Sequence, residues 1–249
     1  MSSITVYRGT PSGRAQKRTV AWPGPPNAHQ VTVRVTHSGL CGTDEQYKSQ
    51  DMILDHEGVG IVEAIGDSVT TLKVGDRPSI PLYAVRESSG ITDQVGVLGL
   101  GGLSHLAVQY AAKMGCHVTV YSHSSGKAEA AQSLGASDFQ VVGSDPLPGR
   151  AVDCLLLAGA QQPDWSTVLS LVRRGGVISA MTVDSSELRC QYGEILMNAI
   201  RIQGSLPAAP NVQREMLSFS ALHKIKPIVE TFSFNEDGID EAMTKLREA

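Results

Sequence analysis

The chain has 249 residues, 41% hydrophobic and 18% charged, which is enough for one large α/β domain or for one domain with a smaller partner. A net charge of −4, an aromatic content of 5% and the lack of a Lys/Arg cluster argue against nucleic-acid binding. No apolar run approaches the length of a membrane span, and residues 1–8 lack the apolar core of a signal peptide, so we expect a soluble, cytoplasmic protein.

The pattern of apolar residues changes along the chain. Residues 1–86 are β-rich, with alternating strands predicted at 30–37 and 59–66. Strands and helices alternate over residues 87–210, and residues 211–249 form a closing helical segment that we expect to return toward the first domain. This rhythm predicts an α/β fold with a doubly wound sheet. Its six parallel strands are expected at Val95–Leu100, His117–Tyr121, Asp138–Val142, Val152–Ala158, Val177–Thr182 and Arg201–Leu206.

A glycine-rich turn, Gly99-Leu100-Gly101-Gly102-Leu103, joins the first of these strands to an amphipathic helix. Gly99 allows a tight turn, Gly101 allows close approach of a phosphate, and the first N–H groups of the helix supply donors. Ser104 stands where the G-x-G-x-x-G pattern has its third glycine, which weakens the motif without abolishing it. The turn predicts a dinucleotide site in a Rossmann sheet; the alternative is a turn in a doubly wound fold that binds nothing.

The end of the second strand indicates which dinucleotide fits. Enzymes that prefer NAD place an acidic residue here to accept the ribose hydroxyls, and this chain has none. Ser122, Ser124 and Lys127 offer hydroxyls and a cation instead, which favours a 2′-phosphate and therefore NADP(H). The alternative is an ordinary polar loop that caps the next helix.

The four cysteines, Cys41, Cys116, Cys154 and Cys190, are widely separated. Their spacing excludes a C-x-x-C zinc knuckle and gives no disulfide framework, so reduced thiols are expected. Cys154 is read as core.

Several further segments occur in one familiar order. They are His37–Asp44, Asp55–Gly60, Gly75–Arg77, the glycine turn, Leu134–Ala136 and Ile225–Pro227. Together they resemble the zinc-dependent medium-chain alcohol dehydrogenases, nearest to the NADP-dependent cinnamyl-alcohol-dehydrogenase-like branch with fungal members. The resemblance covers nearly the whole chain and implies a Rossmann domain at 87–210 and a truncated GroES-like catalytic domain at 1–86.

The resemblance also implies roles for residues. Cys41 and His56 would ligate a catalytic zinc, Glu57 would sit beside the metal, and Thr43 would start a proton relay from the alcohol. A catalytic zinc takes about three protein ligands and keeps one position open. The alternatives are a small buried hydrophobe for Cys41 and a structural histidine for His56.

The resemblance to the family also bears on the end of the sixth strand and on the start of the helix after the glycine turn. The resemblance places the backbone of Gly204 and Ser205 near the nicotinamide amide, although a plain strand-end turn is about as good a reading. His105, just inside the helix after the glycine turn, is read as structural.

The chain also departs from the family. Only 16 residues separate Arg77 from Gln94, where the family has the structural zinc lobe, later strands and a third cysteine ligand. Asp55 replaces the family's glycine, and the chain stops at Ala249, short of the family's final strand. Zinc is therefore expected to bind more weakly unless Asp55 or solvent completes its ligand sphere. Exposed sheet edges in the shortened domain favour a homodimer.

Three functions stay open from the sequence. The first is an NADP(H)-dependent oxidoreductase that interconverts an alcohol and an aldehyde or ketone, zinc-assisted by ancestry. The second is a metal-independent NADPH reductase of a carbonyl or enone, with Tyr83 or Thr43 orienting or protonating the substrate; the pairing of Cys41 with His56 counts against it. The third is a non-catalytic remnant that binds NADP. The identity of the small-molecule substrate is not readable from the sequence.

Overall fold

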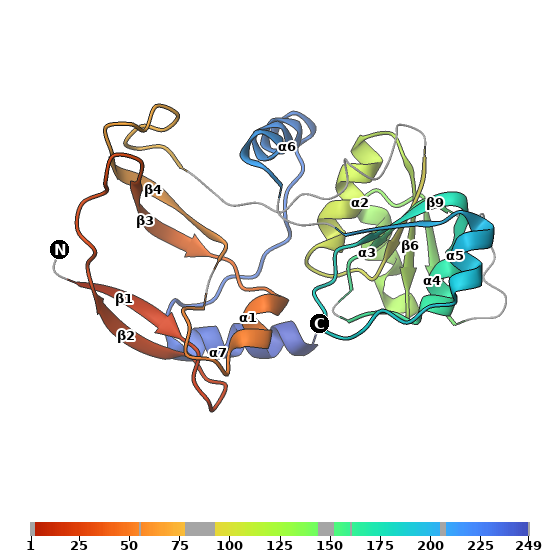
Figure 1. Cartoon of the computed structure of the whole chain (residues 1–249), viewed down its shortest axis with the longest axis horizontal. Helices are drawn as coiled ribbons and strands as arrows, with labels where there is room; N and C mark the ends of the chain where they lie inside the picture. The colour runs from red at the N-terminus through yellow and green to blue at the C-terminus, as the bar shows by residue number, and fades with distance from the viewer. Residues whose placement is uncertain are drawn as a thin grey trace. The chain divides into compact units, whose positions relative to one another are not determined.

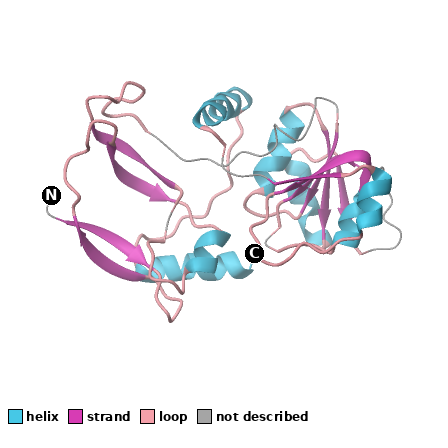
Figure 2. Ribbon diagram, viewed as in Figure 1, coloured by secondary structure: helices cyan, strands magenta, loops and turns pink. Residues whose placement is uncertain are grey.

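The computed structural model describes residues 3–54, 56–77, 93–143, 152–159, 161–204 and 208–248. The chain divides into two compact units, shown in Figures 1 and 2. The first comprises Met1–Pro81 with Glu230–Ala249, and the second is Leu82–Val229. The predicted closing segment 211–249 is thus shared between the units, and the predicted domain boundaries stay a prediction.

The second unit is built on a six-stranded parallel sheet, which confirms the predicted doubly wound fold. The strand order is β10-β9-β8-β5-β6-β7. The strands are β5 (Gln94–Leu98), β6 (His117–Ser122), β7 (Asp138–Val141), β8 (Val152–Leu157), β9 (Val172–Ala180) and β10 (Arg201–Gly204). The first strand ends two residues earlier than predicted because Gly99 adopts a positive φ of 89°.

Helices cover both faces of this sheet (Figure 2). The helical elements of this unit are α2 (Ser104–Lys113), the 3₁₀ turn η1 (Ser125–Lys127), α3 (Ala128–Ser133), α4 (Trp165–Leu171), α5 (Tyr192–Asn198) and α6 (Pro210–His223), of which α6 packs on Tyr110 of α2. Alternate residues of a strand enter separate clusters: Val95 and Val97 pack with α2 and α6, whereas Leu98 packs with α4. Burial on both faces explains why these strands are continuous apolar runs.

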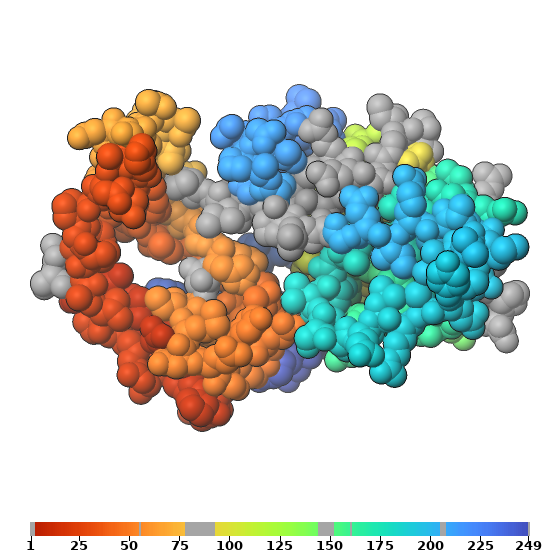
Figure 3. All heavy atoms as spheres, viewed as in Figure 1, coloured from red at the N-terminus to blue at the C-terminus, as the bar shows by residue number. Residues whose placement is uncertain are grey.

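Part of the second unit's surface is apolar. On α5, the side chains of Tyr192, Leu196 and Met197 are exposed, and the helix, in cyan, lies at the surface in Figure 3.

No helix among the described residues is long and apolar enough to cross a membrane.

The described residues of the first unit form two antiparallel strand pairs and two helices. Strand β1 (Ser3–Arg8) pairs with β2 (Gln16–Ala21), and β3 (Val31–Ser38) pairs with β4 (Gly58–Ile65). The helices are α1 (Gly42–Tyr47) and α7 (Glu236–Glu248). No side chain of β3 is buried and its Val35 is 53% exposed, whereas Val62 of β4 is fully buried, so β3 has little cover within the described residues.

The C-terminal helix α7 closes the first unit beside β1 and β2 (Figure 1). Its Ile239 and Met243 pack with Tyr7 in a small apolar cluster. The Asp240 carboxylate accepts hydrogen bonds from the Arg14 side chain at 2.8 Å and from the backbone N–H of Ala15 at 3.0 Å. Helix α7, near the C-terminus, therefore packs in the same unit as the N-terminal strands.

Candidate metal and cofactor sites

Cys41 lies immediately before α1 and is fixed by that helix. Its backbone is extended, with φ −132°, and its Sγ accepts a hydrogen bond from the N–H of Thr43 at 3.4 Å. The Asp44 carboxylate in turn accepts from the N–H of Cys41 at 3.0 Å. This reciprocal pair is a capping box, in which the cysteine sulfur replaces the usual hydroxyl.

The structure brings Cys41, His56 and Glu57 together, although 14 residues separate the first two in sequence. The Sγ of Cys41 lies 3.4 Å from Nε2 of His56, and that nitrogen lies 3.7 Å from a Glu57 carboxylate oxygen. Ligand atoms of all three residues lie within 4.8 Å of one another. The two residues predicted to ligate zinc and the glutamate predicted to sit beside the metal therefore form one cluster, although Cys41 precedes α1 and the other two precede β4.

The separation of Cys41 and His56 fits two ligands of a tetrahedral metal ion. Zinc bonds of about 2.3 Å to sulfur and about 2.0 Å to nitrogen place the two ligand atoms about 3.5 Å apart. The observed separation between Cys41 and His56 is 3.4 Å. With Glu57 as a third ligand, one corner remains for a substrate oxygen or for solvent. Asp55, the other acid weighed from the sequence, lies outside the described residues.

Burial raises the pKa of the Cys41 thiol above its usual value, and the nearby carboxylates of Glu57 and Asp44 raise it further. The hydrogen bond from Thr43 acts in the opposite direction. The thiol is therefore protonated at neutral pH in this environment. A divalent cation beside the sulfur would reverse this preference and stabilise the thiolate.

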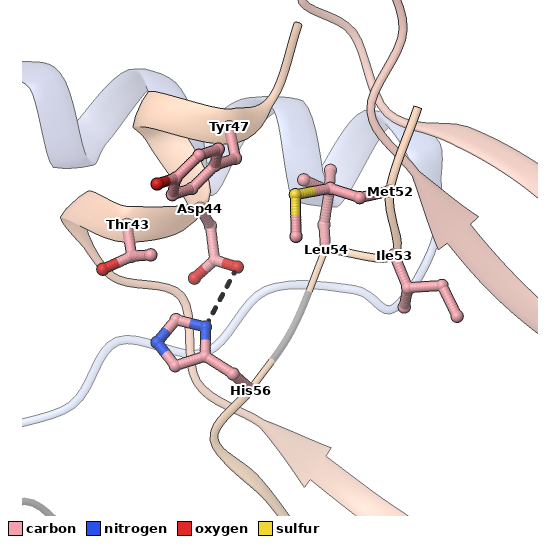
Figure 4. A pocket seen from close by; sticks show the side chains of 7 residues that line it. All are labelled: Thr43, Asp44, Tyr47, Met52, Ile53, Leu54 and His56. Carbon is pink, nitrogen blue, oxygen red and sulfur yellow. Dashed lines mark ion pairs between the residues drawn. The ribbon is translucent and has the colours of Figure 1, made fainter. Parts of the chain in front are cut away.

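Sequence reasoning missed Asp44 as a site residue. Its carboxylate is buried, with a side-chain exposure of 4%, and Oδ1 lies 3.5 Å from Nδ1 of His56 (Figure 4, dashed line). A carboxylate at Nδ1 holds a histidine with Nε2 available for a metal. The available signal was the acidic residue three positions after Cys41, at the start of a helix.

A small pocket adjoins this cluster, with a cavity volume of about 230 Å³. Both Thr43 and His56 line it, so the residue proposed from the resemblance to begin a proton relay faces the same space as a candidate ligand. The other lining residues are Asp44, Tyr47, Met52, Ile53 and Leu54, seen in Figure 4. The pocket can hold a compact apolar group next to the His56 ring.

Close packing at Gly39 also shapes the cluster. A Cβ at Gly39 would overlap the Glu57 carboxylate and lie 3.0 Å from the Cβ of Glu57. Only glycine leaves room for the Glu57 side chain in its present position.

In the second unit, the glycine turn has the geometry that the sequence predicts. Gly99 has a positive φ of 89° and donates its N–H to the carbonyl of Tyr121 at 2.8 Å. A Cβ atom at Gly101 or at Gly102 would meet no atom within 4 Å, so the backbone here is open to a ligand. These features fit a phosphate-binding turn.

The Ser104 side chain fits at the position where the glycine pattern has its third glycine. Its side chain is fully buried, and its Oγ accepts a hydrogen bond from the N–H of Gly101 at 3.0 Å. Within the described part of the chain, the N–H groups of Gly102 and Leu103 make no hydrogen bond. The hydroxyl therefore fastens the turn and leaves two neighbouring donors for an anion.

The predicted residues for a 2′-phosphate gather at the end of β6. Ser122 is buried and accepts a hydrogen bond from the N–H of Ser124 at 3.4 Å. The Nζ of Lys127 donates to the carbonyl of Leu100 in the glycine turn at 3.2 Å. Gly204 ends β10, paired with Ala180, and Ser205 lies outside the described residues. The lysine is thus next to the turn, while Gly204 is on the edge strand of the sheet.

Two family models match the chain. The model described as "Alcohol dehydrogenase GroES-like domain" matches residues 27–138, and the one described as "Zinc-binding dehydrogenase" matches residues 102–221. A probable formaldehyde dehydrogenase of Bacillus subtilis is 34% identical over 306 aligned positions, covering 88% of this chain and 86% of that protein. The chain belongs to the zinc-type medium-chain alcohol dehydrogenase family. The recognition made from the sequence motifs is thereby confirmed.

Other members of this alcohol dehydrogenase family extend the comparison. An NADP-dependent alcohol dehydrogenase of Mycolicibacterium smegmatis is 24% identical, covering 99% of this chain and 95% of that protein. A solved cinnamyl alcohol dehydrogenase of Sorghum bicolor superposes with a TM-score of 0.87 at 19% identity, covering 99% and 94% of the two chains. The 306-position alignment exceeds the 249 residues of this chain, so the Bacillus relative carries segments that this family member lacks.

Proposed function

We propose that this chain is an NADP(H)-dependent oxidoreductase that interconverts an alcohol and an aldehyde or ketone by hydride transfer. The observation that carries the proposal is the cluster of Cys41, His56 and Glu57 beside a pocket of about 230 Å³, in a member of the alcohol dehydrogenase family. Relatives named as an aldehyde reductase of Synechocystis and as alcohol dehydrogenases support the same reaction class.

We assign zinc to this cluster, held by Cys41, His56 and Glu57. A zinc ion there supplies a Lewis acid that polarises the substrate oxygen. Asp44 keeps the His56 ring in place, and Thr43 lies at the pocket wall, where its hydroxyl can accept or return the alcohol proton. The apolar side chains of Met52 and Ile53 would hold the carbon part of the substrate, a small-molecule alcohol or carbonyl compound.

We assign the cofactor's pyrophosphate to the free N–H groups of Gly102 and Leu103, and its 2′-phosphate to Lys127 with Ser122 and Ser124. The lack of an acidic residue at the end of β6 and in η1 supports NADP(H) over NAD(H). A solved cinnamyl alcohol dehydrogenase of Helicobacter pylori in complex with NADP(H) has the same fold, with a TM-score of 0.83 at 16% identity.

The test combines metal analysis with cofactor titration on the purified full chain. We expect close to one zinc per chain, NADPH binding tighter than NADH binding, and NADPH oxidation with a small aldehyde such as benzaldehyde. The variant Cys41→Ala should lose zinc and turnover. The matched control, Cys190→Ala, removes a half-buried thiol of the second unit and should keep both.

Each other outcome identifies an alternative. Full turnover in metal-free protein would make the chain a metal-independent NADPH reductase, with no role for Cys41. Tight NADPH binding without turnover on any carbonyl compound or enone would make it a non-catalytic binding protein. We also propose a cytoplasmic location, because the four cysteines are free thiols, and a homodimer, because β3 has little cover among the described residues.

A further inference from the structure

His105 is bound to two separate segments of the second unit. Its Nε2 accepts a hydrogen bond from the backbone N–H of Ile228 at 3.0 Å, and its Nδ1 lies 3.3 Å from the carbonyl oxygen of Gly101. Because an N–H can only donate, Nε2 carries no proton and Nδ1 is the donor to Gly101. One imidazole ring in a single tautomer therefore joins the glycine turn to residue 228.

The segment that His105 reaches is held mainly by side chains of α2. Gln109, one turn after His105, donates from Nε2 to the carbonyl of Lys226 at 3.1 Å. Ile225 is buried in the core, but the side chains of Ile228 and Val229 are 70% and 68% exposed. Packing therefore anchors residue 225, whereas a hydrogen bond to His105 fixes the backbone at 228.

This segment also has a special place in the chain. Val229 is the last residue of the second unit, and Glu230 begins the segment that belongs to the first. Residues 226–228 thus lie directly before one of the two positions at which the chain passes between the cofactor unit and the unit that contains the metal cluster.

We propose that His105 is a positioning residue that couples occupancy of the glycine turn to the order of residues 226–228. The inference rests on the proposed NADP(H) site. A pyrophosphate bound at the N–H groups of Gly102 and Leu103 fixes the Gly101–Gly102 peptide group, which carries the Gly101 carbonyl, while Ser104 already holds the N–H of Gly101 on the other side. The Gly101 carbonyl then holds the His105 ring more firmly, and the ring holds the Ile228 N–H.

Hydrogen–deuterium exchange on the full chain, with and without NADPH, tests this coupling. Pro227 has no amide hydrogen, so a peptide spanning 226–229 reports few amides besides that of Ile228. In the wild type we expect NADPH to slow exchange both at the turn and at Ile228. A net hydrogen bond corresponds to roughly a 2- to 10-fold change in exchange.

Two conservative variants separate the two bonds of the ring. In His105→Asn, the side-chain amide takes the position of Nδ1, so it can reach the Gly101 carbonyl but not the N–H of Ile228. The amide hydrogen of Ile228 should therefore exchange roughly 2- to 10-fold faster, both with and without NADPH. In His105→Gln, the side-chain amide takes the position of Nε2, so it can accept a hydrogen bond from Ile228 but cannot reach Gly101. The protection of Ile228 without NADPH should therefore remain, while the further slowing caused by NADPH is lost. Gln109→Ala is the control, because it removes the bonds to the carbonyls of His105 and Lys226 but leaves both bonds of the His105 ring, so the NADPH-dependent slowing at Ile228 should remain.

The outcomes distinguish this inference from the proposed function. NADPH-dependent protection of Ile228 that is equal in the wild type and in both His105 variants overturns the coupling. Protection of the turn without any change at Ile228 in the wild type also overturns it. Absence of NADPH-dependent protection at the turn and at Ile228 alike overturns the cofactor proposal, and the coupling with it. Thermal unfolding of each variant establishes that the compared proteins are folded.

Discussion

The Asp44 carboxylate contacts two candidate metal ligands. One oxygen accepts a hydrogen bond from the backbone N–H of Cys41 at 3.0 Å, and the other oxygen lies 3.5 Å from Nδ1 of His56. A buried helix-capping residue thus also orients the histidine ring. The cap and the metal cluster share one carboxylate, so a change at Asp44 reaches both ligands.

Asp44→Asn keeps an oxygen that can cap the helix but removes the charge that faces His56. We expect zinc affinity to fall about 10- to 100-fold, the usual range for loss of a residue that supports a ligand. Competition with a chromophoric chelator measures it. Asp51→Asn, at an exposed acid paired with Arg8, is the control and should bind zinc like the wild type. Equal zinc affinity in wild type and Asp44→Asn would show that this carboxylate does not support the ligands.

Asp164 caps α4 and gives the fold a pH-dependent contribution. Hydrogen bonds from Ser166 and Thr167 hold the pKa of its carboxyl at about 2, below its usual 3.8. The folded state thus favours the ionised form, so the contribution is complete above pH 3.8 and is lost as the pH falls toward 2.

The variant Asp164→Ala should therefore melt a few degrees below the wild type at pH 7, with a difference that shrinks between pH 4 and pH 2. Thermal unfolding at several pH values measures this. A difference in Tm that stays constant over the whole range would mean that the charge on Asp164 plays no part.

The bond from the Gly101 N–H to Ser104 predicts a cost for the smaller side chain. Ser104→Ala leaves that N–H without its acceptor, and we expect a loss of about 1–2 kcal/mol in the free energy of unfolding. Urea denaturation measures the loss. Ser133→Ala removes an exposed hydroxyl that bonds to a carbonyl within α3, and it should change stability by much less. A neutral Ser104→Ala would show that the turn does not depend on this hydroxyl.

The sequence predicts the sheet well because its strands are buried on both faces and read as apolar runs. Contacts between distant residues leave no such local signal. The packing of Ile239 on Tyr7, which joins the two ends of the chain, depends on the folded first unit. The double use of Asp44 likewise requires His56 to be close in space, and the acceptor role of Ser104 appears only once the turn is built.

Lys127 provides the sharpest test of cofactor choice. Its Nζ lies beside the glycine turn, 3.2 Å from the Leu100 carbonyl, and a charge-assisted hydrogen bond to a 2′-phosphate would strengthen NADPH binding only. Lys127→Ala should weaken NADPH binding about 10-fold and leave NADH binding nearly unchanged. Fluorescence titration with both nucleotides measures the ratio. Lys113→Ala, at the far end of α2, controls for the loss of a positive charge and should preserve the preference. If Lys127→Ala weakens both nucleotides equally, the lysine supports the turn through Leu100 and does not select the phosphate.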